Sequence, residues 1–227
     1  MQSSHLRKKL EEAGEFLDTP LGFGRVILNQ MIWSKQLEIL QSVEKFPRTA
    51  VKACHASGKT LIAAVLVLWW ITRHKEAIVV TTAPTYMQVK WLLWGGIHHL
   101  VAQAEMKYPK PTATALHPGP NRYAIGISTN EGVRVQGFHA KNVLFVIDEA
   151  PGVMTDIYEA MEGIRRACTT GFLPMRIWPR CWPPKVIIIN LSLHGTQGTP
   201  IVLSSSKPSP RLWNTSGRAT LSGKLKK

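Results

Sequence analysis

The sequence predicts an α/β domain, in which helices cover both faces of a mainly parallel sheet. Three observations support this fold class. Short β-like runs alternate with helical runs through about the first 170 residues. One run, "VLFVI" at Val143 to Ile147, is continuously apolar, as expected of a parallel strand buried on both faces. Strands separated by helices of this length imply crossover connections between parallel neighbours.

The predicted elements follow one another along the chain. Strands are expected at Thr49 to Ala53, Ala77 to Thr82, Arg122 to Ser128 and Val143 to Ile147, and helices at Thr60 to Arg73, Tyr86 to Glu105 and Val153 to Ala167. The longest apolar run, Leu61 to Ile71, is too short to cross a bilayer, and no apolar signal-peptide segment opens the chain. Three distant cysteines form no C-x-x-C pair. We therefore expect no membrane partner and a reducing, cytoplasmic location.

Charge divides the chain into two parts. Residues 1–162 carry all 14 acidic side chains and 17 of the 28 Lys and Arg, which leaves +3, whereas residues 163–227 carry 11 basic side chains and no acid. The second part is also rich in Pro, Trp and Ser and shows little periodicity. We predict one domain over 1–170, followed by an irregular basic tail over 171–227 that does not form a folded domain.

A candidate phosphate-binding loop lies between the first strand and the helix after it. The stretch "ACHASGKT" matches the P-loop pattern G-x-x-x-x-G-K-S/T except that alanine replaces the first glycine. Alanine is tolerable there if that residue needs no positive φ. Backbone amides of the loop would face the phosphates of ATP, Lys59 would reach the outer phosphates, and the Thr60 hydroxyl would coordinate Mg²⁺. The predicted nucleotide-binding residues of the loop are Ala53, Cys54, His55, Ala56, Ser57, Gly58, Lys59 and Thr60.

Two carboxylates complete the predicted site. Asp148 and Glu149 directly follow the apolar strand, and ligands bind at the carboxyl ends of the strands in open parallel sheets. Asp148 would hold Mg²⁺, and Glu149 would orient or activate the attacking water. The alternative is a strand that merely ends in two solvated acids. Together, the loop and the acidic pair predict a P-loop NTPase that hydrolyses ATP with Mg²⁺, with Lys59 and Glu149 as its catalytic residues.

Four stretches resemble the large terminase subunits of tailed bacteriophages, which are ATP-driven DNA-packaging motors. They are "WSKQLEILQSV", "VKACHASGKT", "VVTTAPTYMQVKWLLWGGI" and "VQGFHAKNVLFVIDEAPGV". The resemblance implies that Gln36 contacts adenine; the alternative is an ordinary exposed helix glutamine. It also implies roles at a nucleic-acid or subunit interface for Thr85 and Gln88, and a phosphate contact for Arg134, although helix-start and solvated side chains are equally compatible with these residues.

The same resemblance implies a function and partners. The chain would couple ATP hydrolysis to translocation of double-stranded DNA, together with a small terminase subunit, a portal protein and further copies of itself, in the cytoplasm of a bacterial host. One alternative is a helicase-like remodelling ATPase. The other is an inactive prophage remnant that at most binds nucleotide.

The tail departs from the terminase pattern. No carboxylate follows Glu162, so a two-metal nuclease domain is not expected, because such sites need anionic oxygen ligands. Three accounts of the tail remain open. It is a basic extension that binds DNA phosphates; or "KVIIIN", Lys185 to Asn190, is the next parallel strand and ends in a polar sensor; or the chain is truncated or frameshifted after about residue 170, the account that the abrupt loss of acids favours.

Overall fold

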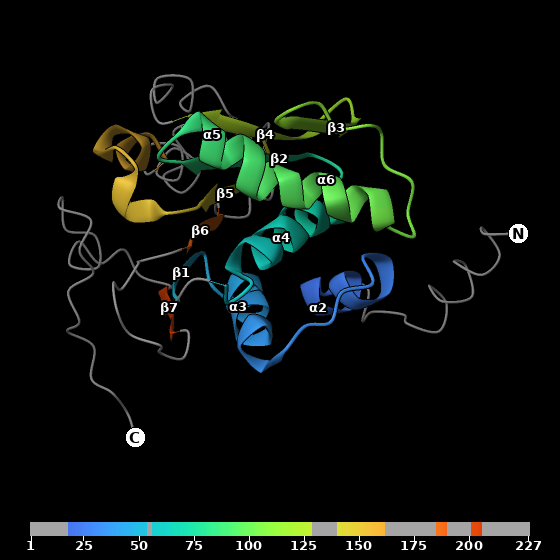
Figure 1. Cartoon of the computed structure of the whole chain (residues 1–227), viewed down its shortest axis with the longest axis horizontal. Coiled ribbons are helices and arrows are strands. Elements are labelled where there is room, and N and C mark those ends of the chain that lie inside the picture. The colour runs from blue at the N-terminus through green and yellow to red at the C-terminus, as the bar shows by residue number, and fades with distance from the viewer. Residues whose placement is uncertain (1–17, 54–55, 129–139, 162–184, 190–200, 206–227) are drawn as a thin grey trace, which may run out of the picture.

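The computed structural model describes residues 18–53, 56–128 and 140–161, together with the backbone of 185–189 and 201–205 (Figure 1). Among these residues the chain forms one seven-stranded sheet with the order β3-β4-β2-β5-β6-β1-β7. The strands are β1 (Arg48–Lys52), β2 (Ala77–Ala83), β3 (Ala115–Gly119), β4 (Arg122–Ser128), β5 (Asn142–Ile147), β6 (Lys185–Ile189) and β7 (Ile201–Ser205). The five inner strands run parallel, and β3 and β7 add one antiparallel strand at each edge.

All four strands predicted from the first 170 residues are present, and every strand end lies within one residue of its predicted position. Parallel neighbours need crossover connections, and helical segments follow β1, β2 and β5. Strand β3 was not predicted, because its sequence ALHPG contains a proline and a glycine, which strands tolerate mainly at sheet edges.

Two strands come from the segment that the sequence analysis treated as an irregular tail. Strand β6 lies between β5 and β1 and pairs in parallel with both, and β7 pairs with the outer side of β1. For 185–189 this agrees with the account in which that segment is the next parallel strand. Asn190 lies outside the described residues, as does most of 171–227, so the structure does not test whether the tail forms a domain or keeps its original reading frame.

Most of the described helices cover one face of the sheet. They are α2 (Pro20–Gly22), the π-helix η2 (Phe23–Ile27), α3 (Ser34–Lys45), α4 (Lys59–Arg73), and a continuous helix built from α5 (Tyr86–Gln88), the π-helix η3 (Val89–Leu93) and α6 (Trp94–Gln103). Figure 1 shows α4 beneath α6, with α3 and α2 below. Within the described part of the chain, no helix is long and apolar enough to cross a membrane.

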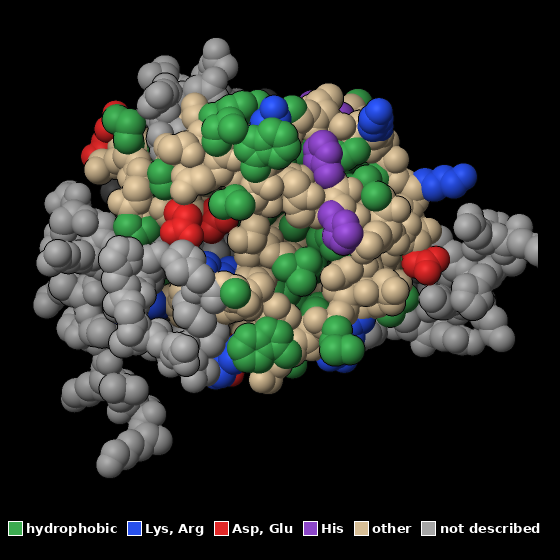
Figure 2. Space-filling model, in the orientation of Figure 1, with side chains coloured by type: hydrophobic (Ala, Val, Ile, Leu, Met, Phe, Trp, Pro, Cys, Tyr) green, Lys and Arg blue, Asp and Glu red, His purple; other side chains and the backbone are tan. Residues whose placement is uncertain are grey.

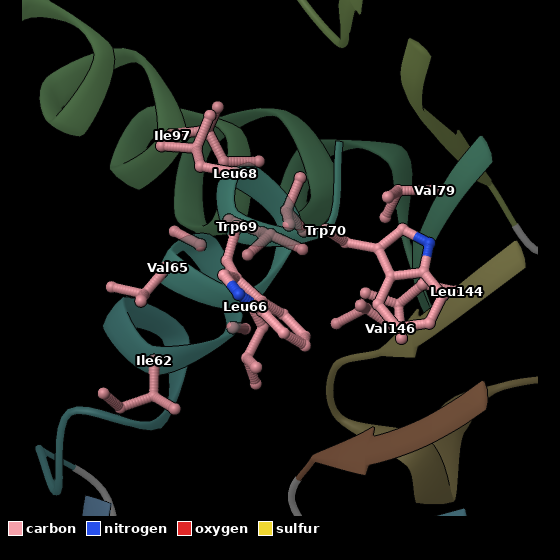
Figure 3. Packing of buried hydrophobic residues seen from close by; sticks show 14 of the residues in the cluster. Ile62, Val65, Leu66, Leu68, Trp69, Trp70, Val79, Ile97, Leu144 and Val146 are labelled. Atoms are coloured by element: carbon pink, nitrogen blue, oxygen red, sulfur yellow. The ribbon is translucent and has the colours of Figure 1, made fainter. Parts of the chain in front are cut away.

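Helix α4 is the centre of the core. Eleven of its residues are buried, so the helix is apolar on nearly all sides and lies between the sheet and the other helices. In Figure 3 the Trp70 ring extends from α4 toward Val79 on β2 and Leu144 and Val146 on β5. Its indole nitrogen donates to the Asn142 carbonyl oxygen at 3.4 Å. This packing fixes α4 against β2 and β5.

A second apolar cluster covers the opposite face of the sheet. It joins residues of β2, β4 and β5 to the 3₁₀ turn η5 (Ala150–Gly152) and to a helical stretch at 155–161. Ala150, Val153 and Ile157 are buried members that follow β5 in the chain. The predicted arrangement, in which helices cover both faces of a parallel sheet, is therefore confirmed.

Candidate nucleotide-binding site

The parallel strands bring the predicted loop and the acidic pair to one edge of the sheet. The loop follows β1, and Asp148 and Glu149 follow β5. Because β1 and β5 both pair in parallel with β6, their carboxyl ends point the same way. Two segments about ninety residues apart in the chain thus meet at the edge where α/β sheets bind ligands.

The backbone of the loop explains which of its residues must be small. Gly58 is in the left-handed region, with φ at 76°, and directly precedes the first residue of α4. Ala56 is also left-handed, with φ at 58°, a conformation that costs a residue with a side chain about 1–2 kcal/mol. Ala53 is not among the described residues with positive φ, so its methyl group causes no backbone strain at the position where the P-loop pattern has glycine.

Gln36 packs directly against the loop. Its side chain is only 5% exposed, so the alternative of an ordinary exposed helix glutamine is wrong. The Gln36 Oε1 accepts a hydrogen bond from the Trp33 backbone N–H at 3.3 Å, which caps the start of α3. A Cβ added at Gly58 would lie 2.4 Å from Gln36 Nε2. The amide therefore links the start of α3 to Gly58 and leaves no room for a larger residue there.

The first turn of α4 meets the acidic pair. The Thr60 hydroxyl donates to Asp148 Oδ2 at 3.5 Å, at the long end of hydrogen-bond range. Lys59 is only 7% exposed, and its ammonium group acts electrostatically on the Asp148 carboxylate. Asp148 itself is 4% exposed and is fixed to the neighbouring strand by a backbone hydrogen bond from its N–H to the Thr82 carbonyl oxygen at 2.9 Å. The cation and the carboxylate thus lie at the same end of the sheet.

Asp148 is a buried carboxyl whose charge its neighbours compensate only in part. Burial raises the pKa of its carboxyl above the ordinary value, and the charge of Glu149 raises it further. Hydrogen bonding from the Glu149 N–H, the Lys59 charge and the Thr60 hydroxyl act in the opposite direction but do not outweigh burial. One hydroxyl and one carboxylate form the hard-oxygen set that Mg²⁺ accepts when water and phosphate supply its remaining ligands. The residues present therefore fit Mg²⁺.

Glu149 has an unusual backbone. Its φ of 51° and ψ of 47° place it in the left-handed region, where a glutamate is strained. Its N–H donates to Asp148 Oδ1 at 3.0 Å, and the Tyr158 hydroxyl donates to the carbonyl oxygen of Ala150 at 2.8 Å, so both sides of the turn are anchored. Strain of this kind persists only where the surrounding structure enforces it, and it concentrates at functional sites.

Comparison with solved structures places this arrangement among known folds. The structure of a large terminase from a thermophilic bacteriophage, in complex with ADP, matches with a TM-score of 0.50 at 13% sequence identity, over 70% of this chain and 38% of that chain. The chain has the fold of the phage large terminases. This is a P-loop NTPase fold, as the sequence predicted, and the chain spans 38% of the length of that terminase.

Two further matches come from the ATPase domain of the large terminase of Thermus phage P74-26. The first, a variant domain, covers 75% of this chain and 69% of that chain with a TM-score of 0.45 at 18% identity. The second covers 71% and 66% with a TM-score of 0.43 at 17% identity. No protein-family model matches the sequence. The search of curated proteins also found no match.

The remaining predicted site residues differ in whether the structure describes them and in what they contact. Cys54, His55 and Arg134 lie outside the described residues. Ser57 is half-buried beside Gly58. Thr85 and Gln88 form a capping box: the Thr85 Oγ1 accepts from the Gln88 N–H at 3.2 Å, and the Gln88 Oε1 accepts from the Thr85 N–H at 3.1 Å. Their described contacts are those of an ordinary helix start.

The tryptophans of the two long helices have different environments. Trp69, Trp70 and Trp94 are buried and belong to the core cluster. Trp91 is 61% exposed and is not a core residue. Figure 2 shows apolar side chains gathered on the surface over helix α5, next to a basic side chain. The exposed apolar residues of this stretch are Tyr86, Met87, Trp91 and Leu92.

Proposed function

We propose that this protein is an ATP-hydrolysing motor domain of the large-terminase type. The observation that carries the proposal is the meeting of Thr60 with Asp148, which joins the phosphate-binding loop to the acidic strand end. A buried lysine next to this pair supplies the positive charge that a triphosphate needs. The terminase whose fold this chain shares was solved in complex with ADP, which supports nucleotide as the ligand.

In the proposed reaction, different residues bind the phosphates, neutralise their charge and accept the proton. Loop amides and the N-terminus of α4 bind the phosphates, and Lys59 neutralises charge on the outer phosphate oxygens. Glu149 accepts a proton from a water molecule as the water oxygen attacks the γ-phosphorus. The bond between the γ-phosphorus and the bridging oxygen breaks, ADP leaves with that oxygen, and inorganic phosphate carries the oxygen of the water. Gln36 is fixed beside Gly58 and would contact the adenine base.

Magnesium is part of the proposal. Thr60 and Asp148 would hold Mg²⁺, which when bound supplies positive charge against the β- and γ-phosphate oxygens. With the ion in place, the ionised form of Asp148 is favoured in spite of its burial. The described residues contain no group of three or more His, Cys, Asp or Glu side chains that could hold a metal ion. We propose that Thr60 and Asp148 form one Mg²⁺-dependent ATPase site.

The proposed partners follow from the packaging role. Double-stranded DNA is the substrate that moves, a portal protein and a small terminase subunit are further partners, and several copies of the chain act together in the cytoplasm of a bacterial host. A strongly basic chain with a net charge of +14 favours polyanionic partners.

The test is ATP hydrolysis by the full chain in the presence and absence of Mg²⁺, duplex DNA and single-stranded DNA. We expect phosphate release that needs Mg²⁺ and rises with duplex DNA. Greater stimulation by single strands than by duplex would favour a helicase-like remodelling ATPase. A chain that binds ATP without releasing phosphate under any of these conditions would be an inactive remnant, and the proposal would be wrong.

A further inference from the structure

Two neighbouring residues of the acidic turn have an unfavourable backbone. Glu149 is left-handed, with φ at 51° and ψ at 47°. Ala150 begins the 3₁₀ turn η5 although Pro151 follows it, and the ring of a proline disfavours helical backbone in the residue before it. Such a turn persists only where surrounding contacts enforce it. The contacts that enforce it therefore also set the direction in which the Glu149 side chain leaves the backbone.

Tyr158 supplies a side-chain contact to this turn. Its hydroxyl donates to the Ala150 carbonyl oxygen at 2.8 Å, and the Val153 N–H donates to the same oxygen at 3.1 Å. A carbonyl oxygen has two lone pairs, so both donors can bond to it at once. The Gly152 N–H donates to the Glu149 carbonyl oxygen at 3.1 Å, so the turn also closes through its own backbone. Of these bonds, the one from the Tyr158 hydroxyl can be removed by a substitution that leaves the backbone intact.

The Tyr158 ring is held by the packing around it. It lies against the second apolar cluster, in which Val153 and Ile157 are buried. Burial also raises the pKa of the Tyr158 phenol to about 12, so the hydroxyl keeps its proton and remains a donor at neutral pH. Water competes little for a hydrogen bond in such surroundings. The helical stretch at 155–161 is therefore tied to the residue directly after Glu149.

We propose that Tyr158 is a positioning residue for ATP hydrolysis, and this rests on the function proposed above. Its hydroxyl holds the Ala150 carbonyl and so keeps Glu149 left-handed, with the carboxylate directed at the attacking water. Without the hydroxyl, the turn relaxes toward less strained conformations in which the carboxylate is displaced from the water. Small displacements of a catalytic group cost large factors in rate. Nucleotide binding by the loop and Lys59 does not depend on this turn.

The test compares Tyr158→Phe with Tyr108→Phe, a matched control, by steady-state ATP hydrolysis and thermal unfolding of the full chain. The Tyr108 and Thr72 hydroxyls lie 2.7 Å apart, and burial raises the pKa of the Tyr108 phenol to about 12 as well. Both variants thus remove one hydrogen bond of a half-buried phenol, but Thr72 lies near the end of α4 opposite to Lys59. Both should lower the melting temperature slightly. Only Tyr158→Phe should lower kcat, about three- to tenfold with KM unchanged.

Two further measurements separate positioning from general stabilisation. Tyr158→Phe combined with Glu149→Gln should be no slower than Glu149→Gln alone, since residues that act as a unit are not additive. In the nucleotide-free protein, the Gly152 and Val153 amides should exchange hydrogen faster in Tyr158→Phe than in the parent, because their hydrogen bonds close the turn. The Asp148 amide, which donates to strand β2, is the internal control and should keep the parent exchange rate.

The outcomes separate this inference from the proposed function. If the parent hydrolyses ATP and Tyr158→Phe is equally fast, the positioning role is wrong and the ATPase stands. The role is also wrong if Tyr108→Phe slows hydrolysis as much, if Tyr158→Phe slows the Glu149→Gln variant further, or if amide exchange in the turn is unchanged. Loss of folding in Tyr158→Phe would assign the hydroxyl to the fold as a whole and would also overturn the role. A parent without hydrolysis would overturn both proposals.

Discussion

Lys59 supplies the buried positive charge of the proposed site, at the first residue of α4. Lys59→Ala removes charge-assisted hydrogen bonds to phosphate, which are worth about 1.5–3 kcal/mol each, so we expect nucleotide affinity to fall at least about tenfold. Titration with a fluorescent ATP analogue measures the change. Lys45→Ala, at an exposed position in the last turn of α3, is the matched control and should bind like the parent. Equal affinity in both variants would contradict the role of Lys59.

Glu149 is expected to act on the attacking water and not on nucleotide binding. Glu149→Gln keeps the size of the side chain but cannot accept the proton, so turnover should fall about 10²–10⁴-fold with nucleotide affinity unchanged. Phosphate-release kinetics and a binding titration on the same preparation measure the two effects. Glu159→Gln, on the exposed side of the helical stretch at 155–161, should hydrolyse at the parent rate. Unchanged turnover in Glu149→Gln would refute the assignment.

Asp148 makes the stability of the nucleotide-free protein depend on pH. Because its folded-state pKa is raised above 3.8 by burial, the folded state binds its proton more tightly than the unfolded state does. This contribution favours folding below pH 3.8 and is lost as the pH rises through the raised pKa. Asp148→Asn should therefore raise the melting temperature at neutral pH without ligand and abolish the extra stabilisation by ATP with Mg²⁺.

Thermal melts from pH 4 to 8, with and without ATP and Mg²⁺, test this expectation. Without ligand, the difference in melting temperature between Asp148→Asn and the parent should shrink toward the acid end of the range, where Asp148 of the parent protonates. If Asp148→Asn melts lower than the parent at neutral pH, burial of the charged carboxylate is not a net cost. If it retains the full magnesium-dependent stabilisation by ATP, Asp148 is not a metal ligand.

The junction between the loop and α4 depends on a glycine that no other residue can replace without strain. Gly58→Ala forces a methyl group into the left-handed region and against Gln36 Nε2, so we expect a loss of about 1–2 kcal/mol or more in stability. Gly95→Ala is the matched control. Gly95 is exposed near the start of α6, and a Cβ there meets nothing within 4 Å.

Because alanine is the better helix former, Gly95→Ala should stabilise the protein by about 0.5–1 kcal/mol. Chemical denaturation of the two variants measures both changes, and the expected signs are opposite. If both variants changed the stability in the same direction, the left-handed conformation and the Gln36 contact would not restrict position 58.

Elements with a strong local pattern could be predicted, and those that depend on neighbours could not. Helix α4 begins at Lys59, one residue before the predicted start, because its apolar run and the preceding glycine are local signals. The predicted helix from Tyr86 is continuous to Gln103, but its π-helical segment has no signature in the sequence that we used. Strand β3 forms only because β4 offers it an antiparallel partner.

The order of strands makes the C-terminal segment part of the sheet. Strand β1, which leads into the phosphate-binding loop, has only β6 and β7 as neighbours. A chain shortened to residues 1–170 loses both, so β1 keeps no backbone partner in the sheet. We expect this shortened chain to unfold without a cooperative transition, whereas a chain of residues 1–205 should unfold like the parent.

Thermal unfolding followed by circular dichroism distinguishes these two chains. Cooperative melting of residues 1–170 at the parent temperature would show that β6 and β7 contribute little, and would support the account in which the sequence after about residue 170 is foreign to the fold. Failure of the 1–205 chain to fold would place an essential contribution within 206–227.

The sequence by itself determined the fold class, the position of the predicted phosphate-binding loop and the acidic pair that follows β5. These features are local: hydrophobic periodicity reports on single strands and helices, and the two motifs occupy short stretches next to them. Only the tertiary structure decided that β6 separates β1 from β5, that Gln36 packs on Gly58, and that the Tyr158 hydroxyl bonds to the turn after Glu149. Strand order and burial depend on which distant segments pair, and a short stretch of sequence does not encode that choice.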